Sequence, residues 1–364
     1  MINLFQVNNH YLKNKKKYLY EVDNVLSSGD YILGENVFKL EKKLKKFIGC
    51  KYAITTSNGT DSLEISLRAL NLNLDDEVIV PAFTWISSAS SVKLAGAKPV
   101  FCDIELDTYG LDLKALEKII NKKTKAVIIV SLYGQISKDI FKIQKLCKKK
   151  KIFLIEDAAQ SFGSVFKNKK SCNIADISTT SFFPTKSLGG YGDAGAIFTN
   201  NKKLSNKIRL IKQNGTLDKK KFTILGRNAR LDELQAVLLI QRLNNFKKVL
   251  NIKRKTAKFY ISKFKNYFRI FNREDNYPSY SLFTLFHKNR NKISKYLKNN
   301  GIQAGVYYKK NLNELKFLTN KKYILPNTIK ACNSVISIPV HEALTTKDKN
   351  FIVSKIVTIV KNCE

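Results

Sequence analysis

Long hydrophobic runs are missing from this sequence, and that absence narrows the kind of protein it can be. No stretch of about 18 apolar residues occurs, so no membrane-spanning helix is expected. The first residues, MINLFQVNNHYLKNKKKYLYEV, do not place a basic segment before an apolar one, which argues against a secretory signal. We therefore expect a cytoplasmic protein without a membrane partner.

Cysteine and histidine are few and dispersed. The cysteines form no CxxC pair and mostly lie in apolar or helical runs, which favours a reducing compartment over a disulfide framework or a zinc site. The histidines are isolated from one another, so no metal centre is expected. These residues are Cys50, Cys102, Cys147, Cys172, Cys332 and Cys363, and His10, His287 and His341.

Arginine is also scarce, with nine residues against 56 lysines, although Lys plus Arg (65) far exceeds Asp plus Glu (29) and the net charge is +36. Such a charge is compatible with nucleic-acid binding, for which arginine is the preferred contact residue. The lysines are spread over nearly the whole chain, and this pattern favours a solvated lysine-rich surface instead. We expect no nucleic-acid partner, although a basic surface could attract an anionic small substrate.

Short apolar runs alternate with amphipathic stretches through the first two-thirds of the chain. Several runs are continuous in Val, Ile and Leu, as in strands buried on both faces. The alternation predicts an α/β domain with a mostly parallel sheet and helices on both sides. The expected strands are 52–57, 77–81, 98–104, 126–134, 152–159, 177–183 and 195–200, and the expected helices are 61–70, 85–95, 113–120, 138–151 and 202–213.

The last third has a different pattern. A helical pattern without Gly or Pro runs from Asp232 to about Lys265 and is interpreted as a long helix that leads out of the first domain. The remaining residues mix strand-like and helical pieces and predict a smaller α+β domain. We therefore expect a large domain over 1–245 and a small domain over 246–364 that includes the linking helix, with the extreme N-terminus able to pack on the small domain.

The stretch SNGTDSLEISLRAL follows an expected strand and opens an expected helix. Asn58, Gly59 and Thr60 would then lie at a helix N-terminus, where free N–H groups and the helix dipole suit a phosphate. The alternative is an ordinary capped helix with Thr60 or Asp61 as its cap.

The stretch LIEDAAQSFG ends a buried strand with Glu156 and Asp157. Carboxylates at the carboxyl end of a parallel strand lie where α/β sheets bind ligands, and a buried carboxylate needs a partner such as a cationic ring nitrogen. A helix cap or a structural ion pair would explain them equally well.

The stretch SFFPTKSLGGYGDAG places Lys186 among aromatic and small residues, unlike the surface lysines. Desolvation lowers the pKa of a lysine and makes it a nucleophile toward carbonyl carbons. A simple loop lysine is the alternative. Together with a helix-start phosphate site and a strand-end aspartate, however, this lysine matches the needs of pyridoxal 5'-phosphate (PLP). Trp85, which follows a strand end, could cover the ring or pack in the core.

The whole chain resembles the DegT/DnrJ/EryC1/StrS family of PLP-dependent sugar aminotransferases. The resemblance runs through GDYILGENVFKLE, SNGTDSLEISLRAL, DEVIVPAFTW, AGAKPVFCDIELDTYGLD, VSLYGQ, IEDAAQSFGS, TSFFPTKSLGGYGDAGAIFTN and GRNARLDELQA. It implies a large domain like that of aspartate aminotransferase, which is fold type I of the PLP enzymes. The phrases YILG, NGTDSL, SLYGQ and SFFPTK are similar to enzymes that aminate the 3-keto position of a nucleotide-linked 2-acetamido hexuronic acid.

The resemblance also implies roles for individual residues. Lys186 is the catalytic residue, which forms a Schiff base with PLP and carries the proton. Asn228 reaches the phosphate from the neighbouring subunit, which makes the active unit a homodimer, and Arg230 lies near the acidic group of the sugar, unless it forms only a structural salt bridge. The remaining cofactor contacts are Asp157 on the ring nitrogen, Gln160 on the ring or its phenolic oxygen, Trp85 on the ring face, and Gly59, Thr60 and Ser181 on the phosphate.

Three positions depart from the family pattern. Tyr307 replaces the histidine of the usual VHYP, Asn214 stands in the place of the histidine in RHG, and Phe286 stands where an arginine is frequent. All three bear on substrate contacts rather than on the cofactor. Tyr308 keeps the family's tyrosine, so Tyr307 and Tyr308 are the expected sugar contacts.

The resemblance implies transamination from L-glutamate to a UDP-linked 3-keto sugar for surface polysaccharides such as the lipopolysaccharide O-antigen. Amination at C4 or of another 3-keto deoxysugar would use the same catalytic residues. A dehydratase of the family typically has histidine in place of the lysine, so Lys186 argues against that activity. A regulatory or nucleic-acid-binding protein that kept the fold is the non-enzymatic alternative.

Overall fold

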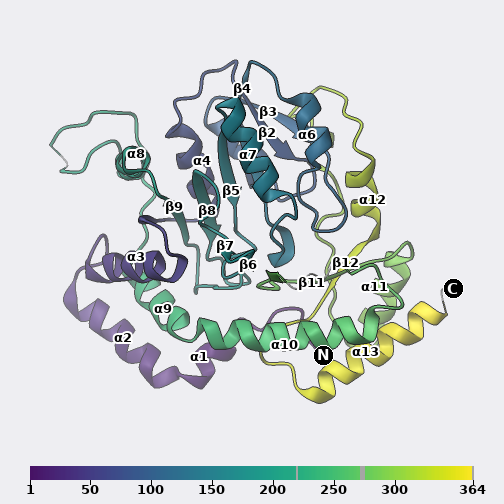
Figure 1. The fold of residues 1–364 in the computed structure, drawn as a ribbon. Coiled ribbons are helices and arrows are strands. Elements are labelled where there is room, and N and C mark those ends of the chain that lie inside the picture. The colour runs from purple at the N-terminus through teal and green to yellow at the C-terminus, as the bar shows by residue number, and fades with distance from the viewer. Residues whose placement is uncertain (219, 271–274, 363–364) are drawn as a thin grey trace.

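The computed structural model describes residues 1–218, 220–270 and 275–362. Its centre is a seven-stranded sheet in the order β1-β9-β8-β5-β4-β2-β3 (Figure 1). The strands β8, β5, β4, β2 and β3 are parallel to one another, whereas β9 is antiparallel to both β8 and β1. Their bounds are β1 Tyr52–Thr56, β2 Glu77–Pro81, β3 Lys98–Cys102, β4 Thr124–Val130, β5 Phe153–Asp157, β8 Ile177–Ser181 and β9 Gly195–Thr199.

Alternate residues of the central strands enter two different cores. Val78 and Val80 of β2 pack on one face of the sheet with Leu63 of α4 (Gly59–Arg68) and Val92 of α5 (Ser87–Leu94). Ile79 enters the opposite core, which α6 (Leu113–Ile119) and α7 (Ile140–Lys150) cover. Because successive side chains of a strand point to opposite faces, the continuous apolar runs of the sequence supply both cores at once.

Helices at the N-terminal side complete this part of the chain. They are α1 (Asn9–Lys13), α2 (Lys15–Ser28) and α3 (Glu35–Ile48), together with α8 (Lys202–Lys212) after the last strand of the sheet. Leu40 and Leu44 of α3 lie in a core with Phe162, Phe198 and residues of α9 (Glu233–Asn244).

The C-terminal part is built around a two-stranded antiparallel sheet of β11 (Phe283–Phe286) and β12 (Val335–Ile338). Side chains of α10, α11 and α13 form one core with these strands, and Figure 1 shows α10 and α13 crossing below the large sheet. The first residues of the chain reach this part, since Ile2 pairs with Ile302. The remaining bounds are α10 Phe246–Phe264, α11 Arg290–Asn299, α12 Pro326–Ser334, α13 Thr346–Lys361, β6 Val165–Phe166, β7 Lys169–Lys170 and β10 Asn276–Tyr277.

The structure corrects two expectations about elements. The helical pattern from Asp232 to about Lys265 is not one helix, because it breaks at Asn245 between α9 and α10. The Asn244–Asn245 pair explains the break, since asparagine side chains compete for backbone hydrogen bonds and weaken a helix. The run 126–134 is a strand only to Val130, because Tyr133 adopts a left-handed backbone (φ 57°) in the turn that follows.

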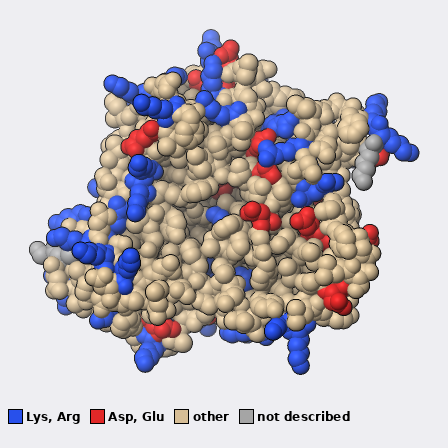
Figure 2. Space-filling model, turned by 180° about the vertical axis from the view of Figure 1, so that it is seen from behind, with Lys and Arg blue, Asp and Glu red and all other residues tan. Residues whose placement is uncertain are grey.

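Five of the cysteines are buried and unpaired, and Cys363 lies outside the described residues. None of the helices formed by the described residues combines the length and apolar character that crossing a bilayer requires. Lysine and arginine are dispersed over the face shown in Figure 2, with acidic side chains between them.

Glu156 is a fully buried carboxylate that ties β5 to its neighbours. It accepts hydrogen bonds from Ser171 Oγ (2.7 Å), Ser178 Oγ (3.1 Å) and the backbone N–H of Cys172 (2.9 Å). Burial raises the pKa of Glu156, although these hydrogen bonds oppose that shift. The carboxylate therefore has hydroxyl and amide partners instead of a cationic one, and it fixes the strand that carries Asp157.

We expect Glu156→Ala to lower the free energy of unfolding by about 3 kcal/mol or more, because it leaves several buried donors without an acceptor. Thermal unfolding followed by circular dichroism measures this loss. Glu117→Ala, which removes an exposed carboxylate from α6, is the matched control and should leave the melting temperature unchanged. Equal melting temperatures for the two variants would contradict the role given to Glu156.

Candidate active site

Asp157 ends β5 at the carboxyl edge of the sheet. Its Oδ2 accepts a hydrogen bond from Ser88 Oγ (2.8 Å) and its Oδ1 accepts one from the N–H of Ala159 (3.1 Å). Burial raises the pKa of Asp157, while Ser88, Ala159 and the charge of Lys186 oppose that shift. Asp157 forms no salt bridge with the described residues, so it can neutralise a bound cation.

Lys186 lies in the loop that follows β8. The loop is fixed at its base by hydrogen bonds from Phe182 N to Ala194 O (2.8 Å) and from Gly190 N to Phe182 O (2.7 Å). Gly189 must lack a side chain, because a Cβ there would lie 2.2 Å from the carbonyl oxygen of Pro184. Burial lowers the pKa of the Lys186 ammonium, and the nearby charge of Asp157 opposes this shift. A lowered pKa suits a lysine that acts as nucleophile and base.

The start of α4 forms a cradle of the kind that binds phosphate. The side chain of Asn58 caps the helix by accepting a hydrogen bond from Asp61 N (2.8 Å). No described residue accepts a hydrogen bond from the N–H groups of Gly59 and Thr60, which open the helix. Gly59 lies against Ser181, because a Cβ at position 59 would be 2.7 Å from the Cβ of Ser181. The structure thus places Gly59 and Ser181 together.

Thr60 and Asp61 are also held in place at this cradle. Thr60 Oγ1 lies 2.8 Å from Ser87 Oγ at the start of α5. Arg227 forms a salt bridge with Asp61 at 2.8 Å (Nη2 to Oδ1), so the buried carboxylate does not leave an unbalanced negative charge beside the free N–H groups. The cradle remains suitable for an anion.

An aromatic wall stands beside Asp157. Gln160 Nε2 donates to the hydroxyl of Tyr308 (3.1 Å), and Gln160 Oε1 accepts from the N–H of Tyr133 (2.7 Å). The ring of Tyr308 lies 5.8 Å from that of Trp85, measured between centroids. Burial, with the charge of Asp157, raises the pKa of Tyr308. Trp85 precedes α5 and is 58% exposed, so it lies at the open side of the site rather than in the core.

Tyr307 is turned differently from Tyr308. Its carbonyl oxygen accepts a hydrogen bond from the hydroxyl of Tyr133, and its ring packs over Gly305, where a Cβ would lie 2.5 Å from Cε2 of Tyr307. Burial raises the pKa of its hydroxyl. Tyr307 thus adjoins the aromatic wall without a described contact to Lys186 or Asp157.

Asn228 and Arg230 lie apart from these residues. Asn228 is exposed, and its Oδ1 accepts a hydrogen bond from Arg230 Nε (2.9 Å). Arg230 forms no salt bridge with a described carboxylate, which removes the structural ion pair as an explanation for it. Apart from this mutual bond, neither residue forms a hydrogen bond or ion pair with another predicted site residue among those that the structure describes.

The remaining departures from the family pattern occupy ordinary structural positions. Asn214 adopts a left-handed backbone (φ 60°) after α8, where its N–H donates to the carbonyl of Arg227 (3.1 Å). Phe286 pairs with Val335 at the end of β11 and packs on the core beneath the sheet.

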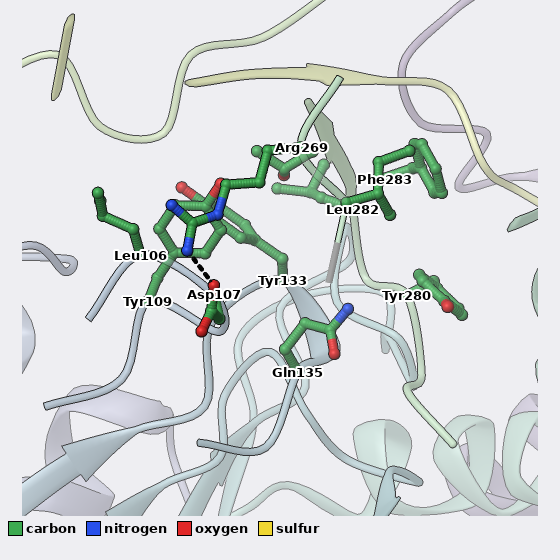
Figure 3. A pocket seen from close by; sticks show the side chains of 11 residues that line it. Leu106, Asp107, Tyr109, Tyr133, Gln135, Arg269, Tyr280, Leu282 and Phe283 are labelled. Carbon is green, nitrogen blue, oxygen red and sulfur yellow. Dashed lines mark hydrogen bonds and ion pairs between the residues drawn. The ribbon is translucent and has the colours of Figure 1, made fainter. Parts of the chain in front are cut away.

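A pocket lies on the other side of Tyr133, between the large sheet and the C-terminal part (Figure 3). Tyr109, Tyr133 and Tyr280 line it, and Arg269 forms an ion pair with Asp107 across its mouth. Lys138 contacts the same carboxylate. Both cations lower the pKa of Asp107 against the effect of burial. The ion pair fastens the C-terminal part to the loop after β3.

Sequence reasoning missed Ser88, whose hydroxyl orients Asp157. Thr84 Oγ1 lies 3.2 Å from Ser88 Oγ, one helical turn earlier. The pattern TWISSAS directly after a strand could have indicated it, because hydroxyl residues there face the carboxyl edge of the sheet. The contact between Gln160 and Tyr308 joins positions 148 residues apart, and no local pattern carries that information.

These residues fit PLP. The unpaired N–H groups of Gly59 and Thr60 suit its phosphate, Asp157 suits a cationic ring nitrogen, and the partly buried Lys186, whose pKa is lowered, suits its carbonyl group. The described residues contain no group of three or more His, Cys, Asp or Glu that could hold a metal ion.

Comparison with known proteins agrees with this arrangement. The model of the DegT/DnrJ/EryC1/StrS aminotransferase family matches residues 13–357. UDP-2-acetamido-2-deoxy-3-oxo-D-glucuronate aminotransferase of Pseudomonas aeruginosa is 41% identical over 348 residues, which are 95% of this chain and 97% of that protein. The pleiotropic regulatory protein of Geobacillus stearothermophilus is 34% identical over 97% of each chain.

The fold is similar to that of a solved structure as well. The crystal structure of ntda from Bacillus subtilis with bound cofactor PMP superposes with a TM-score of 0.90 at 29% identity, covering 96% of this chain and 82% of that one. The expected fold class, a fold type I large domain with a mixed, mostly parallel sheet and a smaller α+β part, is confirmed. Since the family model spans nearly the whole chain and the residues that PLP needs are present, this chain belongs to the DegT/DnrJ/EryC1/StrS aminotransferase family and is a PLP-dependent aminotransferase.

Proposed function

We propose that this protein transfers the amino group of L-glutamate to the 3-keto group of a UDP-linked 2-acetamido hexuronic acid and so forms a UDP-3-amino sugar. The observation that carries the reaction type is the electrostatically coupled pair of the partly buried Lys186 and the buried Asp157, beside the free N–H groups of α4. The printed activity of the Pseudomonas aeruginosa relative supports this choice of sugar. We further propose a cytoplasmic role in surface polysaccharide synthesis, such as that of the lipopolysaccharide O-antigen.

Particular residues would hold the cofactor. When bound, PLP supplies an electron sink for the pair released as the α-C–H bond of the amino donor breaks. Asp157 would neutralise the ring nitrogen, and its buried position strengthens that attraction. The other proposed contacts are Gly59, Thr60 and Ser181 with the phosphate, Gln160 with the ring or its oxygen, and Trp85 with the ring face.

Lys186 would move the proton. Because burial lowers its pKa, its amine is neutral more often than that of a surface lysine and can accept the proton from the α-carbon of the donor. The same amine, now protonated, can return the proton at the next position. The backbone hydrogen bonds of Phe182 and Gly190 hold the base of the loop that carries Lys186.

The exposed residues suggest a site completed by a second subunit. Asn228 and Arg230 contact none of the other proposed site residues of their own chain, and Trp85 is exposed. In a homodimer Asn228 would reach the phosphate of the neighbouring site. Arg230 has no carboxylate partner in the described chain, so its planar donor fork is available for the carboxylate of a hexuronic acid. Tyr307 and Tyr308 are the proposed sugar contacts from the aromatic wall.

A panel of nucleotide sugars tests the proposed substrate. The holoenzyme is incubated with glutamate and with 3-keto or 4-keto sugars, and 2-oxoglutarate release is measured. We expect turnover with the UDP-linked 3-keto hexuronic acid. Turnover of 4-keto sugars alone would show that the enzyme aminates C4 instead of C3. Failure of the protein to bind PLP at all would favour a regulatory role.

We expect Lys186→Ala to lower the rate of 2-oxoglutarate release by at least about a hundredfold, because it removes the group that transfers the proton. The matched control is Lys203→Ala, which removes an exposed lysine from α8 and should keep normal activity. Circular dichroism of both variants establishes that they are folded. Normal turnover by Lys186→Ala would exclude the proposed mechanism.

We expect Arg230→Gln to raise KM for the hexuronic acid substrate by about 10- to 100-fold, the range for losing a hydrogen bond to a charged group. The corresponding neutral hexose, which lacks the carboxylate, serves as the control substrate, and its KM should change little. If both substrates lose affinity equally, Arg230 does not recognise the carboxylate.

A further inference from the structure

A second polar cavity lies beside the Lys186 loop, on the side of α9 and α10. One side is formed by the loop itself, residues 184–187, and the opposite side by Arg242 of α9 and Lys253 of α10. The N-terminal residues 4–7, Ser281 and the segment 340–342 complete the lining. Lys186 lines this cavity, whereas Asp157, Trp85, Gln160 and Tyr308 do not.

The lysine in this cavity is buried without a partner. Lys253 is 7% exposed, and its ammonium forms no hydrogen bond or salt bridge with any described residue. Lys212 is even more buried, at 1% exposed, but its ammonium donates to the carbonyl of Thr55 (2.8 Å). Burial lowers the pKa of Lys253 to about 8, with Glu342 opposing and Arg242 adding to the shift. A lysine that is mostly buried and has so little compensation for its charge favours an anion as its neighbour in the cavity.

Three further polar atoms of the lining are buried without partners. They are Nη1 of Arg242, Oγ of Ser281 and Nδ1 of His341, and Ser281 itself is only 6% exposed. Native proteins rarely leave buried polar atoms unpaired, so several around one cavity indicate an unseen occupant. Arg242 and Lys253 together outnumber the one carboxylate of the lining, Glu342, which favours an anion over a cation.

The protonation of the His341 ring indicates which hydrogen-bonding groups that anion must have. Its Nε2 lies 3.1 Å from the carbonyl oxygen of Asn3, which can only accept, so Nε2 is the donor. Burial lowers the pKa of His341, which favours the neutral ring, and the Nδ1 of a neutral ring with a protonated Nε2 is an acceptor. The occupant must therefore accept from Arg242, Lys253 and Ser281 and donate to His341.

We propose that this cavity is a binding site for hydrogen phosphate, whose oxygens accept from Arg242, Lys253 and Ser281 while its P–OH group donates to Nδ1 of His341. Sulfate has the same shape and no proton to donate at neutral pH, so it satisfies one partner fewer. The bound phosphate lies behind the lysine loop and balances the buried charge of Lys253.

Thermal unfolding of the PLP-loaded enzyme tests the proposal, because bound PLP occupies the cradle at α4. Inorganic phosphate is titrated at pH 7 and constant ionic strength set with chloride, and sulfate is titrated in parallel. A ligand that binds only the folded state raises the melting temperature in a saturable way. We expect this for phosphate, with sulfate at least about tenfold weaker.

Variants locate the effect. Lys253→Met and Ser281→Ala should each raise the apparent Kd for phosphate by about tenfold or more, as expected for the loss of a hydrogen bond to a charged group. Lys255→Met removes an exposed lysine from the same helix and should bind phosphate as the native protein does. If Lys253→Met does not fold, the apparent Kd of Ser281→Ala for phosphate is sufficient to test the proposal.

Two results would overturn the proposal. One is an equal response of all these proteins to phosphate, which would place the effect elsewhere on the basic surface. The other is an equal response to phosphate and sulfate, which would exclude donation to His341.

Discussion

The active site depends on two opposite charges that lie close enough to interact but do not form an ion pair. Asp157 and Lys186 influence each other's pKa, yet they form no salt bridge, because separate sets of contacts hold each one. Ser88 and the N–H of Ala159 fix the carboxylate, and the hydrogen bonds of the loop fix the lysine backbone. A direct ion pair would satisfy both groups and leave neither for a ligand. The separation therefore keeps the site ready for a charged ring.

Contacts around Asp157 fix β5 and the aromatic wall in place. Glu156, one residue before Asp157 and pointing to the opposite face, is saturated by hydroxyl and amide donors and anchors β5. On the side of the aromatic wall, Gln160 connects Tyr133 to Tyr308. These polar side chains, buried on both faces of the sheet, thus have fixed partners.

Much of the sheet could be predicted from the sequence, because strands buried on both faces leave continuous apolar runs such as EVIVP, which is β2 itself. Local sequence patterns gave the wrong end of an element at two places, where the backbone conformation of one residue ends the strand or the helix. Tyr133 ends β4 by adopting a positive φ, and Asn245 divides what looked like one helix. Lys186, Asp157 and Gly59 could be proposed from motifs with known chemistry. Ser88, the pairing of Gln160 with Tyr308 and the cavity around Lys253 depend on long-range packing, which short motifs do not record.

The contact between Gly59 and Ser181 also determines when the proposed phosphate cradle can form during synthesis of the chain. The two halves of the proposed phosphate cradle come from the turn after β1 and from the end of β8, and β9 lies between those strands in the sheet. During synthesis, the chain must extend to Thr199 before β9 can pair with both neighbours. Cofactor capture is then a late event, and an incomplete nascent chain has no cradle in which to retain the coenzyme.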